Sequence, residues 1–321
     1  MKTKAILLGI FAMATLVACN NDENISTGND GRQTAAFTAS IDGQQVIRAH
    51  DTTWDNGDAI GITGKSGDTQ YANVAYATEK GDGNFSVVPP ASAICYQDDE
   101  DVLFTAYYPY TADGKLTDKT KITADTKAQA NQPAFDFLYA TGTGSKHSYN
   151  VPFLFTHRMA KVVLTIKKGF EVSFDEMQAA VLTLQGFRNN GSFDISSGEA
   201  AATGEALASP WTFAHNSSES EDNNAPSTID NKAETIVYAL ILFPQEFSAK
   251  LPFTATIDRT LNALLDFTQA NTNAGDSEPG NYLKAGRQYS LSVTLNKTSL
   301  TVNSCEITQW TDADGGNFDA N

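Results

Sequence analysis

The stretch that decides the fold is Gln-Tyr-Ser-Leu-Ser-Val-Thr-Leu at residues 288–295. Its apolar members stand at every second position, namely Tyr289, Leu291, Val293 and Leu295. Successive residues of a strand point to opposite faces, so these four side chains share one face and the polar ones share the other. A period of two with one apolar face predicts a half-buried β-strand.

Similar short runs recur along the whole chain. They are rich in Thr, Val, Ile, Phe and Tyr, and Gly, Asn, Asp or Pro residues separate them. This pattern is typical of β-sandwiches, and helical periodicity is poor throughout. Residues 111–133 and 197–234 are long and polar, so we expect them to be excursions on the surface. The sequence therefore predicts an all-β protein.

The chain is long enough for two such domains in tandem. The polar, glycine-containing run at residues 141–149 separates two strand-rich parts. We therefore expect an N-terminal β-sandwich domain over residues 35–149 and a C-terminal one over residues 150–321.

The N-terminus has the pattern of an export signal. Two lysines, Lys2 and Lys4, precede an apolar run that is too short to span a bilayer. The run ends in Leu-Val-Ala-Cys at residues 16–19, which resembles the bacterial lipobox. The resemblance implies a signal peptide over residues 1–18 and acyl chains, palmitate among them, on Cys19. Residues 19–34 are polar and are predicted to tether the fold to the outer membrane through that lipid.

Composition excludes several classes of function. A net charge of −16 argues against nucleic acid as a partner, because that affinity depends on neutralising phosphates with Lys and Arg. The four histidines have no metal-ligand spacing, and His157 is predicted to be a hydrogen-bonded core residue. No nucleophile elbow, phosphate loop or Cys/His pair occurs, so we expect no enzyme, no cofactor and no metal. Cys95 and Cys305 are interpreted as separate buried thiols in different domains, the alternative being a single disulfide in an oxidising compartment.

Four further segments have a recognisable order. They are WDNGDAIGI at 54–62 after Ile-Arg-Ala at 47–49, FLFTHRMAKV at 153–162, FPQ at 243–245, and a closing pair of strands from GRQY at 286–289 to ITQW at 307–310. With the lipobox, these segments resemble the fimbrillin family of Bacteroidales lipoproteins, which includes Mfa-like and FimA-like pilus subunits. The resemblance implies two tandem transthyretin-like β-sandwich domains and a role in surface fimbriae and adhesion.

The resemblance also implies a route of assembly. A trypsin-like protease cuts such a precursor after an arginine, the first strand leaves, and a strand from another pilus subunit fills the groove. Here the candidate cleavage residue is Arg48, in a polar segment before Trp54. The removable strand is residues 35–41, with Phe37, Ala39 and Ile41 on its apolar face. Trp54 itself is interpreted as a core residue.

The family's donor strand usually comes from the C-terminus. The candidate here is residues 300–310, with Val302, Ile307 and Trp310 as apolar anchors. The tail after Trp310 is acidic and glycine-rich, which fits a tip or accessory subunit better than a stalk subunit. The alternative is a surface lipoprotein that binds a glycan or a host protein and never polymerises.

Overall fold

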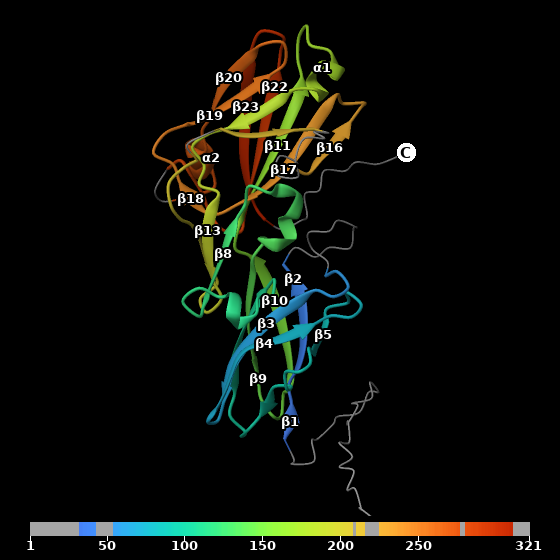
Figure 1. Ribbon diagram of the computed structural model, residues 1–321, viewed down its shortest axis with the longest axis vertical. Helices are drawn as coiled ribbons and strands as arrows, with labels where there is room; N and C mark the ends of the chain where they lie inside the picture. The colour runs from blue at the N-terminus through green and yellow to red at the C-terminus, as the bar shows by residue number, and fades with distance from the viewer. Residues whose placement is uncertain (1–31, 43–53, 208–209, 216–224, 277–279, 311–321) are drawn as a thin grey trace, which may run out of the picture.

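The computed structural model describes residues 32–42, 54–207, 210–215, 225–276 and 280–310. Strands dominate these ranges, which confirms the predicted all-β class. The helical segments within them are short: η1 (Asp113–Lys115), η2 (Gln129–Ala134), α1 (Phe174–Gln178) and α2 (Thr268–Asn273). Figure 1 shows an elongated molecule, with the early strands gathered at one end and the late strands at the other.

Seven strands of the first half hydrogen-bond in a closed ring. In ring order they are β10 (Asn150–His157), β2 (Ala36–Ile41), β5 (Asn84–Val87), β4 (Thr69–Ala77), β3 (Ala59–Ser66), β7 (Val102–Tyr108) and β9 (Leu138–Gly144). A short pair, β1 (Gln33–Thr34) with β6 (Cys95–Tyr96), lies beside it. Large aromatic side chains fill the interior, because each strand turns alternate residues inward.

Strand β10 belongs to this first ring although it begins at Asn150, where the sequence analysis begins the second domain. It runs parallel to β2, with Asn150 opposite Ala36 and Phe155 opposite Ile41. Its last residues pair with β9. Strand pairing therefore keeps residues 150–157 with the first half, and the second half begins at β11 (Ala160–Lys168).

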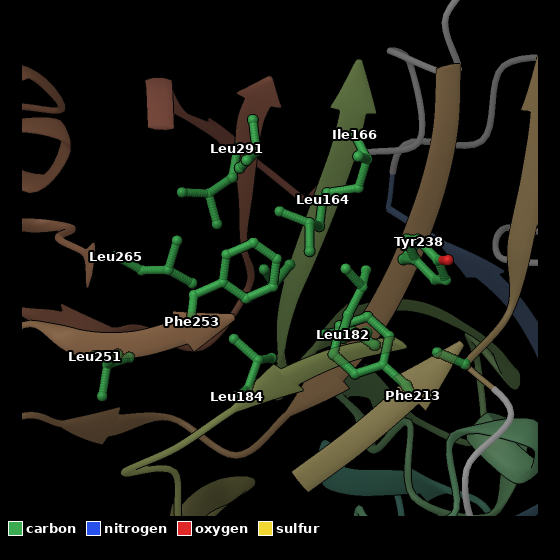
Figure 2. Close-up of a cluster of buried hydrophobic side chains, with 14 of the residues drawn as sticks. Leu164, Ile166, Leu182, Leu184, Phe213, Tyr238, Leu251, Phe253, Leu265 and Leu291 are labelled. Carbon is green, nitrogen blue, oxygen red and sulfur yellow. The ribbon is translucent and has the colours of Figure 1, made fainter. Parts of the chain in front are cut away.

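The second half consists of two facing sheets. The larger sheet has the order β16 (Ser227–Asp230), β17 (Thr235–Leu242), β11, β22 (Arg287–Leu295) and β23 (Leu300–Gln309). The smaller has the order β15 (Trp211–Ala214), β12 (Val181–Leu184), β19 (Leu251–Thr256) and β20 (Thr260–Leu265). In Figure 2, Leu164 and Leu291 of the larger sheet point toward Leu184 and Phe253 of the smaller one, as expected for a β-sandwich.

The stretch at residues 288–295 forms most of β22 and behaves as predicted. The four apolar side chains of its inner face are buried, and the polar ones between them are partly exposed. Because β22 lies between β11 and β23, both edges of its backbone are hydrogen-bonded. It is therefore an interior strand of the larger sheet.

The polar segments 111–133 and 197–234 are more structured than predicted. Strand β8 (Lys121–Asp125) pairs with β13 (Asn190–Asp194), which pairs with β14 (Glu199–Ala202). Strands β15 and β16 also lie in these segments, and a last pair joins β18 (Gln245–Glu246) to β21 (Tyr282–Leu283). The expectation of surface excursions was wrong here, because β8, β14 and β15 each bury one or two side chains, such as Ile122, against a core.

Candidate functional site

Strand β2 is the element on which the expected strand exchange depends. It lies between β10 and β5, so a strand flanks it on each side. Its burial alternates strictly: Phe37, Ala39 and Ile41 are 2%, 9% and 4% exposed, whereas Thr38 and Ser40 are half-buried. The structure therefore places the predicted apolar face of residues 35–41 inside the first core.

Phe37 makes the densest contacts of the three. Its ring lies 4.9 Å from that of Tyr76, 5.3 Å from Phe104 and 5.7 Å from Phe153, measured between ring centroids. The first two pairs meet edge to face, and the third is stacked, which are favoured geometries for aromatic pairs. Loss of β2 would leave three large rings without this partner.

Hydrogen bonds hold β2 to neighbours other than strand partners. Ala35 N–H donates to the Ile94 carbonyl, and Ala39 N–H donates to the Gly83 carbonyl. The Trp54 indole donates from Nε1 to the Ala39 carbonyl at 2.9 Å. Trp54 is 5% exposed and packs edge to face on Phe85, which confirms its interpretation as a core residue. Trp54 therefore both fills the core and fixes the position of β2.

A pocket of about 380 Å³ lies at the end of β2, and Ile41 forms part of its wall. Trp54, Asp58, Tyr108 and Asp136 also line it. Tyr108 donates from its hydroxyl to Asp58 Oδ1 at 3.0 Å. Burial raises the pKa of the Asp58 carboxyl above its ordinary value, and burial together with Asp58 raises the pKa of Tyr108. This is a partly desolvated environment with acidic groups.

Asp58, Tyr108 and Asp136 are not among the site residues predicted from the sequence. Asp58 stands within the quoted run at residues 54–62, so its position beside Trp54 was the available signal. Asp136 comes from a different part of the chain and reaches the pocket only through the fold. No spacing in the sequence brings it near Asp58.

His157 is a buried, hydrogen-bonded residue, as predicted. Its Nδ1 lies 2.9 Å from Asp136 Oδ1, and its side chain is 1% exposed. Its ring stacks on that of Trp310 with 3.8 Å between centroids and 7° between planes. This contact joins the wall of the pocket to the end of the C-terminal strand.

The three expected donor anchors lie in the chain's own sheet. Val302 and Ile307 are half-buried on β23 and pack against the second core, and Trp310 directly after it is 2% exposed. Trp310 N–H donates to the Gly286 carbonyl at 2.7 Å. Strand β23 pairs with β22 and forms an edge of the sheet. To serve as a donor, this segment would first have to leave its own sandwich.

Two expected sites, the lipidation residue Cys19 and the cleavage residue Arg48, lie outside the described residues. Cys95 and Cys305 are both free thiols, on β6 and β23, as predicted, but each is half-buried rather than buried. In the described ranges no three His, Cys, Asp or Glu side chains gather closely enough to bind a metal ion. The α-helices there have five and six residues, far fewer than the roughly 20 that a membrane-spanning helix needs.

Comparison with known proteins gives a consistent result. A protein-family model described as Fimbrillin-like matches residues 48–310. A candidate fimbrium subunit of Bacteroides uniformis, Fim1C, is 26% identical over 324 residues, which cover 98% of each chain. A crystal structure of a candidate cell adhesion protein from Bacteroides ovatus matches with a TM-score of 0.68 at 24% identity, over 87% of this chain and 98% of that one. A second, from Bacteroides uniformis, has a TM-score of 0.65 at 23% identity, over 88% and 100%.

The two crystal structures support the fold, and the family model spans most of the chain from the segment before Trp54 to Trp310. The resemblance found in the sequence is therefore confirmed. This chain belongs to the fimbrillin-like family.

Proposed function

We propose that this protein is an acceptor subunit of a bacterial surface fimbria, at a tip or accessory position. As a member of a family of fimbrial subunits, it associates with other subunits at the cell surface. It is exported as a lipoprotein anchored to the outer membrane through Cys19, and a trypsin-like protease then cuts after Arg48. Residues up to Arg48 depart, and an extended segment of a neighbouring subunit takes their place.

The observation that supports this proposal most is the position of β2. Its neighbours on either side are β10 and β5, its apolar face is buried, and it leads into the segment that contains Arg48. Removing it uncovers apolar side chains and leaves the backbone groups of β10 without partners. Both changes are unfavourable in water, so a vacated groove favours binding of another strand. No energy source other than this binding is needed.

The accessory position follows from β23. The last described strand, β23, is already part of its own sandwich, where Val302 and Ile307 pack half-buried against the second core, and Trp310 directly after it is buried. A subunit that keeps its last strand accepts a neighbour's segment without giving one. Such a subunit ends a polymer.

The test compares the full-length precursor with an Arg48→Ala variant. Limited trypsin digestion, followed by gel electrophoresis and mass spectrometry, is expected to cut the natural protein after Arg48 and to yield ladders of oligomers with a donor-competent fimbrial subunit. The variant should remain folded, by circular dichroism, and fail to enter those oligomers. A matched Arg32→Ala variant, changed in the tether region, should behave as the natural protein does.

Two results would contradict the proposal. Normal assembly of the Arg48→Ala variant would exclude Arg48 as the trigger. A correctly cut protein that stays monomeric with every fimbrial subunit offered would favour the alternative, a surface lipoprotein that binds a glycan or a host protein without polymerising.

A further inference from the structure

We infer that the pocket beyond Ile41 receives a lysine or arginine side chain of the strand that replaces β2. The inference rests on the strand exchange proposed above and adds the chemistry of the incoming segment. Strand exchange by itself requires only alternate apolar residues. The pocket adds a requirement for a cation at one end of the segment.

The charges around the pocket favour a cationic occupant. The carboxylates of Asp58 and Asp136 line it, and no lysine or arginine is among the described residues of its wall. Asp136 uses Oδ1 to bind His157 at 2.9 Å. The aromatic side chains of Trp54 and Tyr108 complete the wall. Carboxylates beside aromatic rings in a partly desolvated pocket are a favourable environment for an ammonium or guanidinium group.

The pocket is continuous with the slot that β2 occupies. Ile41 belongs both to the buried face of β2 and to the pocket wall. Side chains two positions apart share a face, and each residue advances a strand by about 3.3 Å. In a replacing strand, one residue takes the place of Ile41. The side chain two positions after it therefore starts about 7 Å farther along the strand, in the direction of the pocket.

The resident sequence has no basic residue at the two positions that follow Ile41. Position 42 is aspartate and position 43 is glycine, and the first basic residue after Ile41 is Arg48. An incoming strand with lysine or arginine at the position equivalent to Gly43 would thus carry a cation where the resident sequence has a glycine. This difference would favour replacement over return of the original strand.

The partner that fits this pocket is a different subunit. Residues 298–321, which include the expected donor segment, contain no lysine or arginine. A second copy of this segment would bring apolar anchors and acidic residues toward an acidic pocket. The fitting donor is therefore a segment of another chain, apolar at alternate positions and basic just past its last anchor.

The experiment measures displacement of the resident strand from the full chain after it has been nicked at Arg48. The probes are three synthetic peptides that copy residues 35–44, with glycine, glutamine or lysine at position 43, and a fourth that copies residues 300–310. Native mass spectrometry reports the fraction of protein that carries each peptide. The lysine peptide is expected to bind about tenfold more tightly than the glycine and glutamine peptides, as for a hydrogen bond to a charged group.

Variants of the pocket test where that preference originates. Asp58→Asn and Asp136→Asn should each reduce the advantage of the lysine peptide, while Asp101→Asn, in an exposed turn, should preserve it. Because the peptides alone can reveal the preference in the unchanged protein, a variant that folds poorly does not decide the outcome.

The outcomes separate the inference from the proposed function. Equal binding of the three copies of residues 35–44 would overturn the cation pocket and leave strand exchange intact. Tighter binding of the peptide from residues 300–310 than of the lysine peptide would overturn the assignment of a different subunit as donor. Failure of every peptide to displace the resident strand would contradict strand exchange itself, and the cation pocket with it.

Discussion

Among the side chains of β2, Phe37 is the one that packs against other aromatic rings of the first core. Ala39 buries only a methyl group, and Ile41 faces the pocket on one side. Phe37 is enclosed by aromatic rings from three other strands. A side chain so enclosed leaves a cavity when it is truncated, because its neighbours are rigid and packed against one another.

We expect Phe37→Ala to lower the free energy of unfolding of the precursor by about 3–5 kcal/mol. Urea denaturation followed by tryptophan fluorescence would measure it. The matched control is Leu103→Ala on β7, since Leu103 is 63% exposed and its truncation should change stability by less than about 0.5 kcal/mol. Equal losses in the two variants would mean that Phe37 is not a principal contact of the core.

Among the short elements, α1 depends on charged groups at its ends. Five residues are too few for a stable isolated helix, so α1 needs its cap and its surroundings. Ser173 and Glu176 form a capping box, and Lys297, from the turn between β22 and β23, binds Glu176. The pKa of Glu176 is lowered to about 2, first by Lys297 and then by Ser173. These contacts attach α1 to the end of the larger sheet.

The lowered pKa of Glu176 predicts a loss of stability in acid. Its carboxylate stabilises the fold fully above pH 4.5, the ordinary pKa, and this contribution is lost as the pH falls toward about 2, the pKa in the folded protein. Glu176→Gln should therefore be less stable than the natural protein at neutral pH, with a difference that shrinks between pH 4.5 and 2. Urea midpoints across this range measure the effect, and Glu79→Gln, at an exposed position, serves as control. A difference that is constant with pH would contradict the assignment.

At the scale of the whole molecule, a third apolar cluster joins the two halves. Phe137 and Tyr139 come from the first half, Phe243 from the second, and Phe193 from the three-stranded sheet β8–β13–β14 between them. The rings of Phe137 and Phe193 are stacked with 4.7 Å between centroids. In Figure 1, β8 and β13 lie midway along the molecule. The halves are thus connected through packed side chains as well as through the chain.

We expect this cluster to make unfolding of the two halves cooperative. Phe193→Ala should convert a single thermal transition into two, because it removes contacts between the halves and leaves both main cores intact. Differential scanning calorimetry would show the separation. Phe213→Ala, a substitution of the same size inside the second core, should lower the transition temperature of the second half without the same loss of coupling.

How far the sequence predicts the structure depends on the range of the interaction. Local alternation predicts the strand at residues 288–295 and the buried face of residues 35–41, because the period of a strand is visible in a single segment. It cannot show that β10 pairs with β2 or that β8 pairs with β13, since those pairings join segments far apart in the chain. For the same reason, the sequence does not show that Asp58 and Asp136 line the same pocket. The weakly apolar strand β8 was missed because its burial depends on a surface formed by other segments.

The parallel alignment of β2 with β10 determines the polarity of an assembly built on this slot. A replacement that restores the hydrogen bonds to β10 must enter with the same N-to-C direction as the strand it replaces. Every joint made in this way is head-to-tail, so an open filament of such subunits has two unlike ends. A subunit that accepts a segment and gives none belongs at one of those ends only.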